Sequence, residues 1–389
     1  FQHYIEVGSM NIAIPLTVVF IVAFAANLIL TPVIIHLAHR KRWYDRHDHR
    51  KIHNGPVPRL GGVGMILATI IALLVGTLLS LRGILPPFVL PVVAGALLVF
   101  HILGLVDDFL NVPARRKLLV QVLGAAIVAL GMYLQLLWYE SGFVPGGPAL
   151  WAIVLLAFLW TLSVTNAVNL IDGMDGLAGG VAAVAVIAAA ITGISIQDAG
   201  VAMFGTVFAG AVLAFLMFNR PPASIFMGDC GSLFLGGAIA VTPLLAGSFH
   251  GFLLTFLVLL AALAIPGVDT AFSIFRRIRR GVAIHAPDRG HVHHKLMELG
   301  WGVPTILVAV YGTAIVAAGV TLVAGLSSLR TGAFIALGMW VVVGGAFLVI
   351  GALHQRQALG VEPHELPIDA PKPENPVGPT HASFSRRAR

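Results

Sequence analysis

The chain contains little charge and almost no cysteine. Only 11% of its 389 residues are Asp, Glu, Lys or Arg, whereas a typical soluble protein contains about 25%. Since 58% of the residues are hydrophobic, this scarcity of charge excludes a soluble globular protein and a disordered chain. The one cysteine, Cys230, excludes an intramolecular disulfide and any metal site built from several cysteines.

Long apolar runs dominate what is present, and no alternating pattern predicts a strand. A helix needs about 20 apolar residues to cross a bilayer, and eleven runs of this kind occur. The sequence therefore predicts an all-α polytopic membrane protein. The predicted spans are 12–38, 61–81, 87–106, 118–137, 149–171, 177–196, 199–218, 231–248, 251–275, 303–325 and 331–353.

The two ends of the chain differ from this apolar body. Residues 1–9 resemble a cloning remnant, because Gly8-Ser9 precedes a methionine, Met10, that reads as a native start. Residues 10–354 form the predicted eleven-span domain. Residues 355–389, rich in Pro, Glu and Arg, are predicted to be a disordered cytoplasmic tail.

Basic residues indicate the orientation. With the amino terminus outside, every lysine and arginine except Arg82 and Arg330 falls in an inner loop or in the tail. Basic loops mark the cytoplasmic side, so the carboxy terminus is predicted to be cytoplasmic.

Carboxylates at membrane spans are costly and usually functional, although helix-end charge is the simpler alternative for any one of them. Those at predicted inner ends are Asp107, Asp108, Asp172, Asp175, Asp229 and Asp269.

Two motifs place polar side chains on helix faces. Asp107-Asp108 is followed by Lys117 and Gln121, which share one face of the next helix because they are four residues apart. Adjacent carboxylates can share a proton, or one can bind metal while the other takes the proton.

In the second motif, Asn166, Asn169 and Asp172 recur every three residues and line one stripe of the fifth span. Gly173 and Gly176 then allow a tight turn close to a ligand. The alternative for this stripe is polar contact between helices.

A third motif runs from Asn219 to Phe226-Met-Gly-Asp229. Asp229 lies between glycine and cysteine just before a predicted span, where one carboxylate and substrate phosphates can hold Mg²⁺. Phe226 is suited to stacking on a base or, alternatively, to anchoring the chain at the membrane interface.

The fourth and fifth motifs are basic. Arg289, His291, His293 and His294 follow a run of arginines. Three histidines suggest zinc, but abundant oxygen ligands and arginine favour a diphosphate. In the first inner loop, prolines precede Arg59 and the Gly61-Gly62 pair, which predicts a fixed loop whose N–H groups can face an anion; a basic connector is the alternative.

Together these five segments resemble the polyprenyl-phosphate N-acetylhexosamine-1-phosphate transferase superfamily, in family order from Lys51 to His294. Its members include bacterial GlcNAc-1-phosphate transferases of cell-envelope glycan synthesis and the phospho-MurNAc-pentapeptide translocase. The resemblance implies transfer of GlcNAc-1-phosphate from UDP-GlcNAc to a polyprenyl phosphate, with release of UMP. It implies Mg²⁺ as cofactor, with Mn²⁺ as an alternative ion, a bacterial inner membrane and a cytoplasmic site. It further implies a homodimer as a common assembly, and no nucleic-acid partner.

The resemblance also implies roles for individual residues. Asp229 binds Mg²⁺, while Phe226 and the turn from Gly173 to Asp175 hold uridine. Lys117 and Asn219 face phosphates, and Asn169 and Asp172 line the cleft. Either Asp107 or Asp108 deprotonates or orients the lipid phosphate. His291, His293 and His294 bind the diphosphate or stabilise its charge, and Arg289 helps to recognise the N-acetyl sugar.

Other classes of function fit less well. Within the superfamily, Val-Pro-Arg59-Leu-Gly-Gly and the histidine segment favour the GlcNAc branch over the pentapeptide translocase or another UDP-N-acetylhexosamine. An ion-coupled transporter would place its site near the midplane between repeats, and no repeat is evident. In a CDP-alcohol phosphotransferase, Asp-Gly is soon followed by Ala-Arg, whereas Asp172-Gly173 continues as Met-Asp-Gly.

Overall fold

The computed structural model describes residues 12–44, 57–81, 85–139, 147–283 and 290–360. Within these ranges the chain is helical, and the only strand-like pairing is an isolated bridge between Tyr44 and Pro58. The predicted cloning remnant lies outside the described residues. So does the tail from residue 361 onward, whereas residues 355–360 continue the last helix.

Ten of the helices are long and apolar enough to cross a membrane, which makes the chain a multi-pass membrane protein. Each matches one predicted span. These ten helices are α2 (Ala13–Lys41), α3 (Gly61–Gly76), α4 (Val89–Leu110), α5 (Ala114–Trp138), α6 (Pro148–Ile171), α7 (Leu177–Ser195), α8 (Ala199–Asn219), α9 (Gly228–Val241), α13 (Val303–Ser327) and α14 (Leu329–Gly360). The other helices are α10 (Phe249–Ala262), α11 (Ala264–Arg279) and the short α12 (Val292–Glu298).

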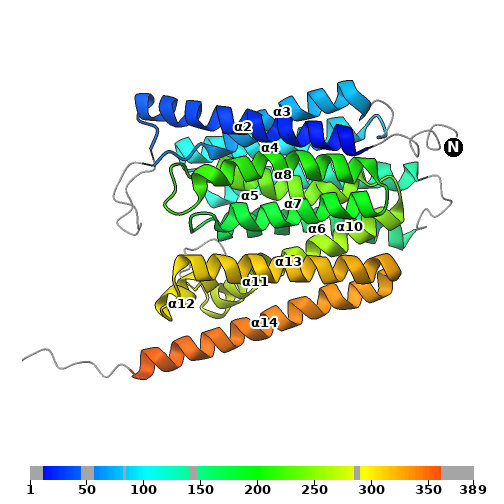
Figure 1. Ribbon diagram of the computed structural model, residues 1–389. Coiled ribbons are helices and arrows are strands. Elements are labelled where there is room, and N and C mark those ends of the chain that lie inside the picture. The colour runs from blue at the N-terminus through cyan, green and yellow to red at the C-terminus, as the bar shows by residue number, and fades with distance from the viewer. Residues whose placement is uncertain (1–11, 45–56, 82–84, 140–146, 284–289, 361–389) are drawn as a thin grey trace, which may run out of the picture.

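The long helices run side by side as one bundle (Figure 1). α2 begins at one end of it, and α14 finishes at the other. The short helix α12 lies at the same end as the carboxy-terminal end of α14. The two described ends of the chain therefore lie at opposite ends of the bundle.

Helix α9 lies at the centre of the packing and is almost entirely buried. Small residues allow this close approach: a Cβ on Gly236 would lie 2.6 Å from the Cα atom of Thr165, and one on Gly104 would overlap the backbone of Asp229. Glycine at helix crossings lets membrane helices approach backbone to backbone. This packing fixes the first turn of α9, which carries Asp229, against α4 and α6.

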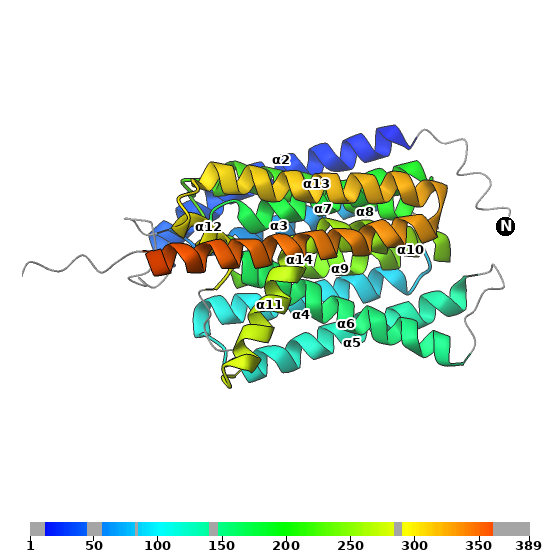
Figure 2. The same ribbon diagram turned by 90° about the horizontal axis from the view of Figure 1, so that it is seen from below.

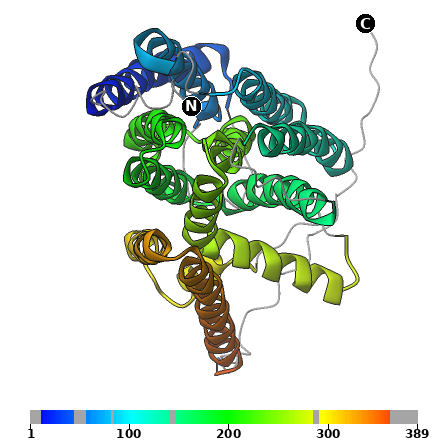
Figure 3. The ribbon, with the colours of Figure 1, turned by 90° about the vertical axis from the view of Figure 1, so that its right-hand side faces the viewer.

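The ninth predicted span, 251–275, is not one straight helix. It divides into α10 and α11, which are bent by 66° relative to each other. Pro266 explains the break, because proline lacks the N–H that would bond to the carbonyl four residues earlier and its ring crowds that carbonyl. α11 consequently leaves the bundle direction and runs obliquely across its neighbours (Figures 2 and 3).

Candidate active site

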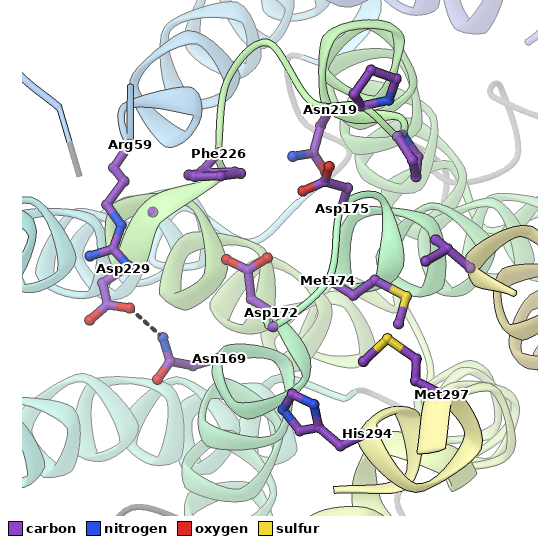
Figure 4. A pocket seen from close by; sticks show the side chains of 15 residues that line it. Arg59, Asn169, Asp172, Met174, Asp175, Asn219, Phe226, Asp229, His294 and Met297 are labelled. Carbon is purple, nitrogen blue, oxygen red and sulfur yellow. Dashed lines mark hydrogen bonds between the residues drawn. The ribbon is translucent and has the colours of Figure 1, made fainter. Parts of the chain in front are cut away.

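A cavity of about 560 Å³ opens among the loops at the α12 end of the bundle. Residues from α6, α8, α9, α12 and α13 and from the loops between helices converge on it (Figure 4). The lining residues are Arg59, Asn169, Asp172, Gly173, Met174, Asp175, Asn219, Pro221, Pro222, Phe226, Gly228, Asp229, His294, Met297 and Val303.

Asp229, in the first turn of α9, is held between a cation and an amide. Lys117 Nζ on α5 donates to Asp229 Oδ2 at 2.6 Å and to Asp107 Oδ2 at 2.8 Å. Asn169 Nδ2 donates to Asp229 Oδ1 at 2.8 Å and also bonds to the Ser232 hydroxyl. Lys117 therefore neutralises charge on two carboxylates at once, and one of them faces the cavity.

Asp108 acts on the backbone. Its two carboxylate oxygens accept the N–H groups of Asp229 at 2.8 Å and of Cys230 at 3.0 Å. These are unpaired donors at the start of α9, where a carboxylate is electrostatically favoured. Asp107 and Asp108 are thus adjacent in sequence but serve different partners, and neither lines the cavity.

The loop before α3 is fixed by the loop before α9. Gly61 N–H donates to Phe226 O and Gly62 N–H donates to Met227 O, each at 3.1 Å, while Phe226 N–H returns a bond to Pro58 O. The N–H groups of Gly61 and Gly62 therefore do not face an anion, because both are bonded to carbonyls. The pairing instead brings Arg59 and Phe226 to one wall of the cavity.

The predicted polar stripe of α6 is confirmed as one face with three different contacts. Asn166 Nδ2 donates to Gln121 Oε1 at 3.1 Å, and Asn169 reaches Asp229. Asp172, directly after the helix, points into the cavity (Figure 4). Although its side chain is partly exposed there, burial and then the nearby Asp229 carboxylate raise the pKa of Asp172 to about 7.

The turn after α6 is fastened to the loop after α8. Asn219 is buried, accepts from Gly176 N–H at 3.0 Å and donates to Ile225 O at 2.9 Å. Asp175 accepts from Ala223 N–H at 2.9 Å. Gly176 adopts a φ of +79°, which side chains other than glycine rarely tolerate. These bonds define the wall that was predicted to hold uridine.

The three histidines have different environments. His294 lines the cavity, whereas His293 is only 1% exposed and neither of its ring nitrogens has a partner among the described residues. His293 Nε2 lies beside Gly173, where an added Cβ would be 3.1 Å away. His291 is also buried and is bonded to Asp269. Only one of the three predicted diphosphate ligands therefore faces the cavity directly.

The structure brings most of the predicted site residues to this cavity. Lys117, Asp107, Asp108, His291 and His293 stand behind its wall. Arg289 lies outside the described residues. Sequence reasoning assigned no role to Arg59, although it quoted the motif that contains it, and it missed an apolar wall made of Met174, Pro221, Pro222, Met297 and Val303.

The cavity fits the Mg²⁺ that the motifs imply only with help from a substrate. Among the residues that the structure describes, no group of three or more His, Cys, Asp or Glu side chains could hold a metal alone. Mg²⁺ usually binds through one or two carboxylates, waters and substrate phosphates. The Asp229 carboxylate, with Asp172 on the same cavity, supplies hard oxygen ligands of that kind.

Comparisons with known proteins point to one family. Residues 90–247 match the family described as glycosyl transferase family 4. The chain is 32% identical over 288 residues to a Bacillus subtilis protein named as a probable undecaprenyl-phosphate N-acetylglucosaminyl 1-phosphate transferase, covering 74% of this chain and 78% of the relative. It is 30% identical over 359 residues to a decaprenyl-phosphate N-acetylglucosaminephosphotransferase of Mycobacterium leprae, covering 86% and 88%. A phospho-N-acetylmuramoyl-pentapeptide-transferase of Shouchella clausii is 31% identical over 247 residues, covering 58% and 74%.

Proposed function

The chain belongs to glycosyl transferase family 4, and we propose that it transfers GlcNAc-1-phosphate from UDP-GlcNAc to a polyprenyl phosphate of the undecaprenyl type. The products are polyprenyl-diphosphate-GlcNAc and UMP. The names of the relatives in Bacillus subtilis and Mycobacterium leprae support GlcNAc as the sugar and a polyprenyl phosphate as the acceptor.

The observation that carries this proposal is the setting of Asp229. Its carboxylate lies on the cavity wall, bonded to Lys117 and Asn169, with Asp172, Arg59 and His294 on the same cavity. Phosphoryl-type transfer requires positioning and charge neutralisation more than covalent help. Positive and negative groups around one cavity of about 560 Å³, within the usual range of small-molecule sites, suit a nucleotide sugar.

The uridine and the diphosphate of the donor each have matching residues in the cavity. Phe226 and the turn from Gly173 to Asp175 hold the uridine, since an aromatic face and a close backbone suit a flat base. Arg59 faces the phosphates, and Asn219 holds the uridine wall in place through its bonds to Gly176 and Ile225. His294, on α12, stabilises charge on the diphosphate, and His293 and His291 support it from behind.

Asp229 is the residue that would hold Mg²⁺, with Asp172 beside it. When bound, the ion neutralises charge on the diphosphate and the leaving UMP. Lys117 keeps Asp229 oriented, and its positive charge offsets the negative charges of Asp229 and Asp107. Asn169 holds the second carboxylate oxygen of Asp229.

The reaction is a direct displacement. An oxygen of the lipid phosphate attacks the phosphorus that carries the sugar, the bond between that phosphorus and the bridging oxygen breaks, and UMP leaves with the bridging oxygen. A phosphate monoester is already largely ionised at pH 7, so no aspartyl intermediate is needed. Asp107 and Asp108 contribute from behind the wall, Asp107 by holding Lys117 and Asp108 by holding the backbone of Asp229.

The site faces the cytoplasm of a bacterial cell, at the plasma membrane. Every lysine and arginine except Arg82 and Arg330 falls in loops assigned to the cavity side or in the tail, and basic loops remain cytoplasmic. UDP-sugars are cytoplasmic substrates, so this orientation gives the donor direct access to the cavity.

The test is UMP release by the purified protein in detergent, with undecaprenyl phosphate and either UDP-GlcNAc or UDP-MurNAc-pentapeptide, with Mg²⁺ or with EDTA. We expect Mg²⁺-dependent UMP from UDP-GlcNAc alone, and its loss in Asp229→Asn. Asp198→Asn, at the opposite end of the bundle, serves as the matched control. Release only from the pentapeptide substrate would overturn the choice of sugar, and no release from folded protein with either donor would overturn the proposed reaction.

A further inference from the structure

A buried carboxylate on α11 holds the first histidine of the His291–His294 segment. Asp269 is 1% exposed, and its Oδ2 atom lies 2.9 Å from His291 Nδ1. Its Oδ1 atom accepts the backbone N–H of Val292, the first residue of α12, at 3.1 Å. An ionised carboxylate only accepts hydrogen bonds, so the proton of the His291 ring lies on Nδ1.

This contact continues through the other histidines to the cavity. The His291 and His293 rings are stacked, with centroids 5.9 Å apart and an interplanar angle of 10°. The His293 and His294 rings follow at 4.2 Å. Because His294 lines the cavity, a continuous series of contacting side chains connects Asp269 to the proposed diphosphate site, although Asp269 itself does not line the cavity.

Among the described residues, His293 adds no hydrogen bond that would hold the three histidine rings in place. His293 is buried, and its ring nitrogens are without partners in the described part of the chain, so packing alone orients it. Hydrogen bonds to buried charged groups are stronger and more directional than packing. The two bonds to Asp269 therefore anchor the start of α12 and orient its first turn.

We propose that Asp269 is a positioning residue for the transfer reaction, acting through His291 and Val292 to hold His294 at the diphosphate. This inference rests on the proposed function. It assigns a purpose to the break between α10 and α11: the 66° bend directs α11 across the bundle, and α11 carries Asp269 to the start of α12. It also explains why a buried carboxylate that does not line the cavity lies beside the histidine segment.

The central variant is Asp269→Asn. A carboxylate accepts through two oxygens, whereas an amide offers one acceptor and one donor group. Asn can therefore keep the Val292 N–H bond only by turning its NH₂ group to His291, which removes the acceptor for the His291 Nδ1 proton and forces that proton onto Nε2. Asp269→Glu keeps both acceptors, displaced by one methylene. Thr270→Val is the matched control, because Thr270 is the next residue on α11 and its hydroxyl has no partner among the described residues.

The readouts are kcat and KM for UDP-GlcNAc, with UMP affinity measured separately by calorimetry. UMP lacks the second phosphate, so the proposal expects Asp269→Asn to bind UMP within about twofold of wild type while kcat falls at least about tenfold. Asp269→Glu recovers part of kcat, and Thr270→Val resembles wild type. The double variant Asp269→Asn/His291→Gln loses about as much as either single variant, because the two residues act as a unit.

Equal kcat in Asp269→Asn and Thr270→Val would overturn the proposal, and so would additive losses in the double variant. If Asp269→Asn does not fold, as judged by absent UMP binding, Asp269→Glu and His291→Gln provide the same comparison. An inactive wild type would overturn the proposed function instead, so the two failures are distinguishable.

Discussion

Lys117 and Asp229 form a salt bridge with Nζ and Oδ2 2.6 Å apart, although they are separated by 112 residues and lie on different helices. The lysine is only 17% exposed, whereas the Asp229 side chain is 33% exposed and faces the cavity. The half-buried cation thus supports a more accessible carboxylate from behind. This arrangement suits a carboxylate that must meet phosphates and a metal ion without losing its orientation.

Replacing this lysine tests that role. In Lys117→Met, Asp107 and Asp229 lose their shared cation, and the loss of one preorganised charge is expected to lower kcat by about 100-fold or more. The Mg²⁺ concentration for half-maximal activity should not rise, because the site becomes more negative. Arg116→Met, an exposed neighbour, is the control. Retention of more than a tenth of the activity would contradict the role assigned to Lys117.

Asp108 provides a second test. Asp108→Asn leaves one of the two N–H groups at the start of α9 without its acceptor, which should cost about 1–3 kcal/mol of stability and displace Asp229. Asp198 also accepts two backbone N–H groups, those of Val201 and Gly247, but at the other end of the bundle. We expect both Asn variants to unfold at lower temperature, and only Asp108→Asn to lose turnover. Equal activity in the two variants would argue against this role.

Much of the architecture was predictable because its signals are local. Apolar runs of about 20 residues locate the spans. The three-residue spacing of Asn166, Asn169 and Asp172 correctly predicts a shared face, and the spacing of Lys117 and Gln121 does the same for α5. These patterns depend only on helix geometry within one segment.

Contacts between helices could not be read in this way. Periodicity shows which face of a helix is polar, but not which distant helix lies opposite, so the bonds from Asp108 to α9 and from Asp269 to His291 were not predicted. The break before Pro266 was also undecidable. Membrane helices tolerate proline, and Pro32 lies inside the continuous helix α2.

Gly228 should not tolerate a side chain, for two reasons: backbone strain and steric overlap. Gly281, which shares only the backbone conformation, distinguishes the two. Both Gly228 and Gly281 have positive φ angles, +71° and +67°. A Cβ on Gly281 meets nothing within 4 Å, whereas one on Gly228 would overlap Arg59 O and lie 2.7 Å from Asp108 Oδ2. Gly281→Ala therefore costs only backbone strain of about 1–2 kcal/mol. Gly228→Ala should lower the unfolding temperature further and abolish UMP release; equal effects would contradict this account.

His293 should make the folded protein sensitive to mild acid. Burial, followed by the effect of His294, lowers the pKa of His293 to about 4, from an ordinary value of 6.5. The unfolded chain therefore binds a proton at a higher pH than the folded protein does. The stabilising contribution of neutral His293 is complete above pH 6.5 and is lost as the pH falls towards 4, by up to about 3 kcal/mol.

Between pH 7 and pH 5, the unfolding temperature of the wild type in detergent should fall more than that of His293→Gln, which has no such proton to bind. His250→Gln, at an exposed histidine of α10, should retain the wild-type pH dependence; the same decrease in all three proteins would show that other groups control acid stability.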